Sequence, residues 1–359
     1  MKKTVLIVGA GASLAEAIPS HPKRSLTPPL DATFFELCRQ AGYQGQPSVR
    51  KYMDAEFGID PFTGGYGMEE IFNYIYTDAF SSHPSPGCLD AYWALIGMYR
   101  SAIANTTNPL HGKSRSGIGS VIRTLLDHEP DREISIVTFN QDLVIEKAIE
   151  ATKGMRKYSA IPWSLVDAYG ATFKRTVAVA TSTTHFTNSG GPSIDVLKMH
   201  GSLNWVYRVR SGSDPKNSLR TPPADLVCVN DQRIFPRLTE TVRGSKRTRQ
   251  YDVIPLIVPP IYEKSARYQA VLQPVWDLSS AALHSAEELI VFGYSFPDAD
   301  FSSKALIRQC LHKNTALRML HVIDVSASTA GKIADIVPLS SCHSYETAVA
   351  FKEIYTDEN

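Results

Sequence analysis

Near its N-terminus the chain reads Val5-Leu6-Ile7-Val8-Gly9-Ala10-Gly11-Ala12-Ser13. Residues 4–8 form a continuous apolar, largely β-branched run, which is typical of a strand buried in a parallel sheet. The glycines follow where such a strand turns into a helix, and their missing Cβ lets the backbone approach another group closely. The stretch therefore predicts a strand, a tight turn and a helix, the opening unit of an α/β fold.

Comparable apolar runs recur along the chain, and stretches with helical periodicity separate several of them. We predict strands at Ile134–Val137, Val196–Met199, Leu256–Val258, Leu289–Phe292 and Met319–Val325. We predict helices at Asp142–Thr152, Ala266–His284, Ser302–Leu311 and Thr329–Ile336. Alternating strands and helices indicate an α/β fold with a doubly wound, parallel, Rossmann-like sheet, which binds its ligand at the carboxyl ends of the strands.

Two segments break this alternation and define the predicted domain organisation. Residues 31–130 have the texture of a mainly helical insertion, and residues 206–252 form a loop-rich insertion with many Arg, Ser and Pro residues. Residues 1–30 and 131–359 are predicted to form the main domain, which carries the sheet and contains the insertion 206–252. Within the first insertion we predict helices at Phe34–Ala41, Met68–Phe80, Cys88–Ser101 and Ile118–His128.

Composition narrows the class of protein. The 359 residues are 43% hydrophobic and carry a net charge of only +1, so no overall charge draws the chain to nucleic acid or anionic membranes. No apolar run approaches the roughly 20 residues of a membrane span, and no signal-peptide pattern precedes the first strand. The five cysteines are scattered without a Cys-x-x-Cys pair, which fits a reducing cytoplasm and predicts no zinc site.

Three short motifs each follow a predicted strand, so their residues are expected to meet at one edge of the sheet. The first is the glycine turn, which suits a pyrophosphate at a helix N-terminus but serves equally well to pack a strand against a helix. The second is Thr138-Phe139-Asn140-Gln141-Asp142, where helix capping is the commoner use of Asn or Asp. The third is Lys198-Met199-His200-Gly201-Ser202, in which His200 is either a structural histidine or a proton acceptor.

Taken together and in this order, the motifs resemble those of the sirtuin family, whose site breaks the nicotinamide–ribose bond of NAD. The first motif matches the family's Gly-Ala-Gly-x-Ser, and Ala17-Ile18-Pro19 follows where the family has Gly-Ile-Pro. The second matches Thr-Gln-Asn-Ile-Asp at Thr, Asn and Asp, and the third is close to Leu-His-Gly-Ser. Beyond Pro19 the family's Asp-Phe-Arg is replaced by Ser20-His21-Pro22.

The resemblance implies a role for each matching residue. Asn140 would hold the nicotinamide ribose and a water, Asp142 would receive the carboxamide NH2, and His200 would accept a proton. The turn residues Gly9, Ala10, Gly11, Ala12 and Ser13 would bind the dinucleotide.

The adenosine half of NAD is assigned to two later strand ends. The segment Val291–Asp298 is similar to the family's Gly-Thr-Ser loop, which places Gly293 and Ser295 beside the adenosine. Gly293 and Pro297 could instead simply shape a turn. Asp324 ends another predicted strand, where the resemblance implies a ribose contact.

The missing zinc ribbon points to one branch of the family. Residues 206–252 stand where the deacylases carry that ribbon, and they contain a single cysteine, Cys228. The chain therefore resembles the bacterial defence-associated sirtuins, some of which pair with a HerA-type hexameric ATPase. This implies a cytoplasmic NAD+ glycohydrolase that uses NAD as its substrate, releases nicotinamide and ADP-ribose, needs no metal and acts against phage. Cyclisation would need the same residues.

Two other functions are left open by the sequence. One is a module that senses NAD or ADP-ribose without turnover. The other is an effector on nucleic acid within an ATPase complex, suggested by the basic residues Arg243, Lys246, Arg247 and Arg249.

We also expect a homo-oligomer. The helical insertion carries more apolar positions than a binding crevice needs, and any that are not used in its own core would form a contact surface. The positions considered are Ile71, Phe72, Ile75, Tyr92, Trp93 and Ile96.

Overall fold

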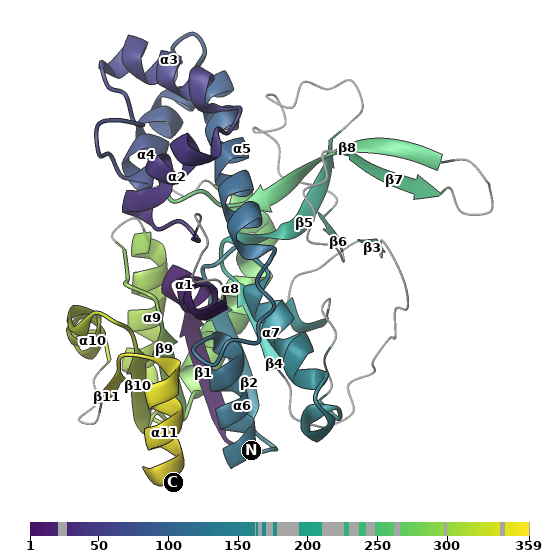
Figure 1. Cartoon of the computed structure of the whole chain (residues 1–359), viewed down its shortest axis with the longest axis vertical. Helices are drawn as coiled ribbons and strands as arrows, with labels where there is room; N and C mark the ends of the chain where they lie inside the picture. The colour runs from purple at the N-terminus through teal and green to yellow at the C-terminus, as the bar shows by residue number, and fades with distance from the viewer. Residues whose placement is uncertain are drawn as a thin grey trace.

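The computed structural model shows three parts: a central sheet with flanking helices, a helical unit above its upper edge, and a smaller second sheet (Figure 1). It describes residues 1–20, 27–161, 163, 167–169, 175–177, 194–209, 226–229, 237–241, 248–261, 266–297, 300–337 and 342–358.

The central sheet has six parallel strands in the order β11-β10-β9-β1-β2-β4. Counted along the chain within this sheet, that order is 6-5-4-1-2-3, the doubly wound arrangement that binds dinucleotides. The predicted fold class is therefore confirmed. The strands are β1 Lys3–Val8, β2 Glu133–Thr138, β4 Ile194–Lys198, β9 Glu288–Phe292, β10 Met319–Ile323 and β11 Cys342–Tyr345.

The register brings the strand ends that carry the motifs to one level. Val8, the last residue of β1, pairs with Thr138 of β2 and with Phe292 of β9, and Thr138 pairs in turn with Lys198 of β4. The chain changes direction across the sheet between β1 and β9. A ligand crevice is expected outside the carboxyl ends of strands at such a switch point.

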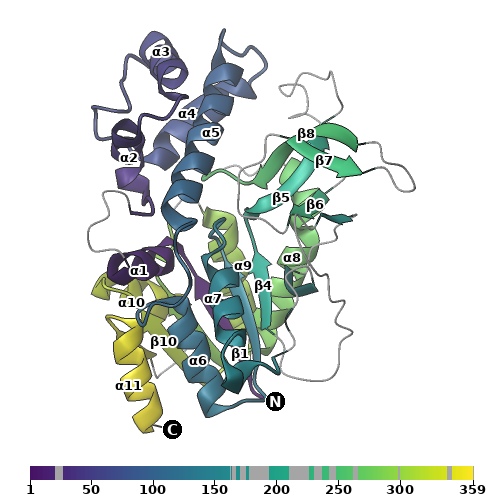
Figure 2. The same ribbon diagram turned by 45° about the vertical axis from the view of Figure 1, so that its right-hand side comes forward.

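Helices cover both faces of the central sheet (Figures 1 and 2). One group packs together around α6, and α8 packs with α9 and lies against β1, β2 and β4. The apolar strand interiors and these helices share one continuous core. The first group is α1 Ala10–Ser20, α6 Ile118–His128, α7 Val144–Lys153 and α11 Ala348–Glu358; the other helices are α8 Ala266–Ser285, α9 Phe301–Lys313 and α10 Ala327–Ala334.

The helical unit has a core of its own. Ile71, Phe72, Ile75, Tyr92 and Ile96 are all buried in it, and Trp93 packs against it half-buried, so these positions do not form an exposed stripe. The helix α6 instead shares the core of the sheet, and we therefore propose a compact helical unit shorter than residues 31–130. The unit comprises η1 Asp31–Thr33, α2 Phe34–Ala41, α3 Gln46–Phe57, α4 Met68–Ala79 and α5 Cys88–Thr107.

The second sheet corrects one prediction. The run Leu256–Val258 was expected as a strand of the parallel sheet, but β8 pairs antiparallel with β5 and β7 in the second sheet. The apolar pattern led to the wrong sheet because Leu256 and Val258 are buried in the main core although they lie at the end of a strand of the second sheet. This sheet has the order β3-β6-β5-β8-β7, with β3 Arg175–Val177, β5 Gly201–Val209, β6 Leu226–Val229, β7 Arg237–Thr241 and β8 Thr248–Ile257.

Two further observations concern the predicted partners. In the parts of the chain that the structure describes, no helix is long and apolar enough to cross a membrane. Arg243, Lys246 and Arg247 lie outside the described residues, and Arg249 belongs to β8.

Candidate functional site

A cavity of about 870 Å³ opens at the carboxyl ends of β1, β2, β9 and β10, and the helical unit forms its far wall. This volume lies in the range of small-molecule and cofactor sites. Of the residues predicted for the site, Ala12 does not line the cavity, because it is buried behind the turn. The predicted residues that line it are Gly9, Ala10, Gly11, Ser13, Asn140, Asp142, His200, Gly293, Ser295 and Asp324.

The turn after β1 touches the loop after β9, and this contact requires the glycines of the first motif. The amide of Gly11 donates to the carbonyl of Gly293 at 2.9 Å, and a Cβ on Gly9 would lie 2.5 Å from the same oxygen. The amide of Ala12 also has an acceptor, because it donates to the Gly9 carbonyl. Among the described residues the amide of Ala10, the first of α1, has no acceptor. An anion at this helix N-terminus would therefore meet the Ala10 amide.

Asn140 presents an oxygen to the cavity. Its Nδ2 donates to the Gly9 carbonyl at 2.8 Å and to Ser13 Oγ at 3.1 Å. Because the Gly9 carbonyl can only accept, these bonds fix the orientation of the amide and use both of its protons. Oδ1 is left without a partner among the described residues, so it can accept a hydrogen bond from a hydroxyl group or a water.

Asp142 bonds to the start of α7 and also lines the cavity. Its Oδ1 accepts the amide of Val144 at 2.9 Å, which caps the start of α7, while Oδ2 accepts the Ser13 hydroxyl at 2.7 Å. Each carboxylate oxygen can accept a second hydrogen bond. Asp142 therefore caps a helix and still lines the cavity.

Lys198 supports this turn from behind and was not predicted to have a role. Its side chain is fully buried, and Nζ donates to the backbone carbonyl of Asp142 and lies 2.8 Å from Glu146 Oε1. Its position as the first residue of the third motif is the only signal that the sequence offers.

His200 lies beside two buried side chains, Asp300 and Tyr294, that the sequence analysis did not identify. Its Nε2 lies 3.5 Å from Asp300 Oδ1, and Tyr294 donates its hydroxyl to Asp300 Oδ2 at 3.0 Å. Burial raises the pKa of Tyr294 well above its usual value, and the Asp300 charge raises it further, so the phenol remains a donor. Phe139 stacks on Tyr294 with ring centroids 4.3 Å apart.

The opposite end of the cavity lies at β10 and β11. Asp324 is half-buried there, with Oδ1 accepting the Ser326 amide at 2.8 Å, while Ser295, in the loop after β9, is exposed. Val325 is 87% exposed in the same wall, an unusual position for a large apolar side chain. An aromatic or apolar ligand group could cover it.

The helical unit contributes Met68, Glu69, Tyr99 and Ile103 to the wall. Burial raises the pKa of Tyr99, and the charges of Asp300 and Asp142 raise it further. The phenol is therefore uncharged.

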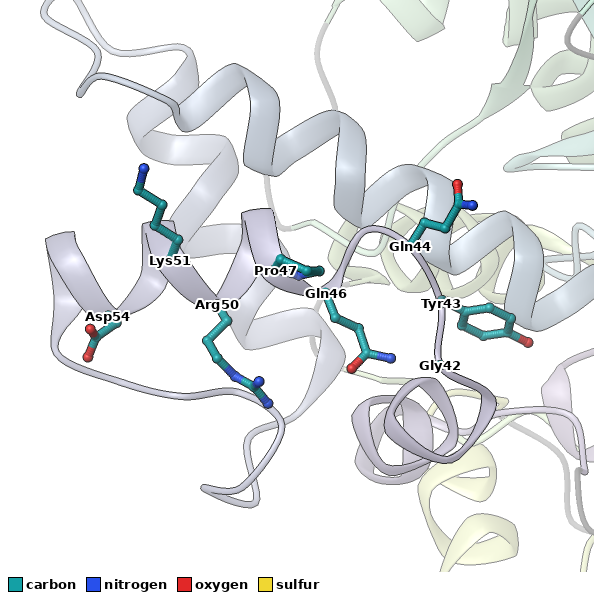
Figure 3. Close-up of a pocket in the computed structure, with 8 residues that line it drawn as sticks. All are labelled: Gly42, Tyr43, Gln44, Gln46, Pro47, Arg50, Lys51 and Asp54. Atoms are coloured by element: carbon teal, nitrogen blue, oxygen red, sulfur yellow. The ribbon is translucent and has the colours of Figure 1, made fainter.

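A second hollow, on the outer face of the helical unit, contains none of the predicted site residues (Figure 3). Arg50 points into it from α3, but its guanidinium is paired with Asp60 at 3.0 Å and lies over the Phe62 ring. In the described residues no group of His, Cys, Asp or Glu side chains is placed to hold a metal ion.

Comparison with known proteins gives distant likenesses only. No family model and no curated protein matches the chain. One similar structure is Sir2 in complex with the inhibitor EX-527, 2′-O-acetyl-ADP-ribose and deacetylated p53 peptide; identity is 14%, the TM-score is 0.34, and the match covers 99% of this chain and 93% of that one. Another, from work on the mechanism and regulation of Sir2 enzymes, has 12% identity, a TM-score of 0.34 and coverage of 99% and 91%.

Proposed function

We propose that the chain binds NAD in this cavity and hydrolyses its nicotinamide–ribose bond, as an NAD+ glycohydrolase. The observation that supports this is the meeting of three motifs in one cavity at the switch point of a dinucleotide-type sheet. Asn140 supplies a fixed acceptor there, and His200 supplies an imidazole beside a carboxylate.

The chemistry follows from the bond that breaks. The C1′–N bond cleaves with its electron pair going to the nicotinamide ring, which departs neutral and needs no general acid. A water oxygen then bonds to C1′, and its proton passes to His200, a role worth roughly 10²–10⁴-fold in rate. The products are nicotinamide, ADP-ribose and a proton.

Asn140 and Asp142 hold the reacting half of the substrate. Oδ1 of Asn140 accepts from a ribose hydroxyl or from the attacking water, and Asp142 accepts from the carboxamide NH2. Such positioning can supply a large part of the acceleration.

The rest of the dinucleotide lies along the sheet edge. The pyrophosphate meets the N-terminus of α1 at Ala10, where the helix dipole favours an anion. Gly293, Ser295 and Asp324 lie on the adenosine side.

The test is incubation of purified protein with NAD, followed by chromatography. We expect nicotinamide and ADP-ribose; cyclic ADP-ribose would indicate cyclisation instead. His200→Ala and Asn140→Ala should abolish turnover, whereas the exposed His284→Ala and Asn105→Ala should not. Wild-type protein that binds NAD without releasing nicotinamide would support a sensing module and contradict the proposal.

The setting we propose is anti-phage defence, with NAD depletion controlled by assembly as a homo-oligomer, alongside a HerA-type ATPase. Its support is the motif resemblance and the lack of Cys-x-x-Cys pairs. Light scattering at micromolar concentration tests the oligomer, and a monomer that is fully active alone would contradict control by assembly.

A further inference from the structure

We propose that Asp300 is the positioning residue for His200, holding the imidazole by Nε2 and fixing which ring nitrogen carries the lone pair. The effect on turnover rests on the proposed function; the effect on the histidine does not. The two residues come from distant parts of the chain, His200 from the turn after β4 and Asp300 from the start of α9.

The protonation state follows from the pairing. A carboxylate accepts and cannot donate, so the 3.5 Å approach of Asp300 Oδ1 to Nε2 favours a proton on that nitrogen. In the neutral ring the lone pair then resides on Nδ1. Both side chains are almost fully buried, which strengthens the interaction relative to one in water.

Tyr294 orients the carboxylate. Its hydroxyl donates to Asp300 Oδ2, and the other carboxylate oxygen, Oδ1, lies toward His200. Tyr294 is itself held between two rings, stacked on Phe139 and tilted against Phe296 at a centroid distance of 4.5 Å.

The backbone of the loop from Gly293 to Phe296 is strained, and this conformation positions Tyr294. Gly293 has φ +60° and Phe296 has φ +55°, and Phe296 is the only non-glycine residue with positive φ in the described part of the chain. A bulky residue in this region is strained, and the conformation persists only where the surroundings enforce it. Here the left-handed turns place Tyr294 between Phe139 and Asp300.

Three other titratable groups of the cavity wall, Asp142 and two tyrosines, do not take the place of Asp300. Asp142 is engaged by Ser13 and by the Val144 amide, and the two tyrosines remain uncharged. Besides His200, the titratable groups that line the cavity are Asp31, Glu69, Tyr99, Asp142, Tyr294, Asp300, Asp324, Lys332 and Glu346.

The experiment is a nuclear magnetic resonance titration of 15N-labelled histidine in wild-type protein and in Asp300→Asn. In the wild type we expect the neutral His200 ring to carry its proton on Nε2. Removing the negative charge destabilises the imidazolium, so the pKa of His200 should fall in Asp300→Asn, and the tautomer balance should shift toward Nδ1–H. Asp127→Asn is the matched control, since Asp127 also accepts a tyrosine hydroxyl but lies at the surface.

Kinetics provide the second readout. If NAD is the substrate, kcat of Asp300→Asn should fall by about 10²-fold with little change in KM, and the lower limb of its pH profile should move to lower pH. Tyr294→Phe should give a smaller change in the same direction.

The outcomes separate the two proposals. A wild-type His200 with its proton on Nδ1, or an unchanged titration in folded Asp300→Asn, would overturn the positioning role even if NAD is cleaved. A shifted titration in a protein that does not cleave NAD would overturn the proposed function and leave the positioning role intact. The wild-type measurement decides the tautomer even if Asp300→Asn does not fold.

Discussion

At the scale of single residues, the site depends on contacts between segments far apart in the sequence. The motifs could be predicted because each places a recognisable residue type at a strand end. Asp300 and Tyr99 could not, because Asp300 matters through its approach to His200 and Tyr99 through its place in the cavity wall, and no local pattern records either. Lys198 is similar: a lysine within an apolar strand becomes informative only when Glu146 is found beside it.

The glycine turn gives a prediction at this scale. In Gly11→Ala the new Cβ would lie 2.8 Å from the Gly293 Cα, so the two loops must separate. We expect a lower melting temperature and weaker NAD binding, measured by thermal unfolding and calorimetry. The matched control is Gly97→Ala in the exposed face of α5, where the new Cβ meets nothing within 4 Å. That change should stabilise the protein by about 0.5–1 kcal/mol. Equal behaviour of the two variants would show that loop contact does not need Gly11.

At the scale of elements, burial decided which strands could be predicted. The central strands β1, β2 and β9 are almost fully buried, so their apolar runs are continuous. The edge strand β11 was missed because only Tyr345 of its four residues is buried. Leu256–Val258 was assigned to the wrong sheet, since burial alone does not tell which sheet a strand joins.

The helical unit supplies a testable contact through α5. The Tyr99 ring packs edge-on against Phe34 and Phe72, and its hydroxyl has no hydrogen-bond partner among the described residues. Tyr99→Phe keeps this packing and removes a group that lines the cavity. We expect KM for NAD to rise about 3–10-fold, the equivalent of one hydrogen bond of roughly 1 kcal/mol, with an unchanged melting temperature. Tyr158→Phe, which removes a surface hydroxyl bonded to Asp127, should leave KM unaltered. An unchanged KM in Tyr99→Phe would mean that NAD does not reach the helical unit.

At the scale of the whole molecule, the carboxyl ends and the amino ends of the central strands have different roles. The carboxyl ends carry the cavity, whereas the amino ends are held by a buried polar network around Glu288. Arg132 binds Glu288 and Thr4, and Tyr355 of α11 donates to Glu288 Oε1 at 2.9 Å. His321 of β10 lies 3.4 Å from the same oxygen. The network joins the first strand, the helix α11 and the second half of the sheet.

This network predicts how stability depends on pH. Burial raises the pKa of Glu288, but the nearby His321 side chain and the Arg132 charge outweigh it and lower the pKa to about 2, from 4.5. A carboxylate with a depressed pKa stabilises the fold above the unfolded value of 4.5, and that stabilisation is lost as pH falls from 4.5 toward 2. The contribution at pH 7 is on the order of 3 kcal/mol.

Glu288→Gln tests that dependence. It should destabilise the protein at pH 7, because Arg132 loses its buried counter-charge, and the gap to wild type should narrow as the pH falls toward 3. Denaturant unfolding at several pH values measures both effects. The control is Glu129→Gln, which removes the half-exposed partner of Arg132 and should change little at any pH. The contrary outcome is that the free energies of unfolding of Glu288→Gln and wild type differ by the same amount across this range. That result would mean that Glu288 titrates normally and that packing alone holds the amino ends of the strands together.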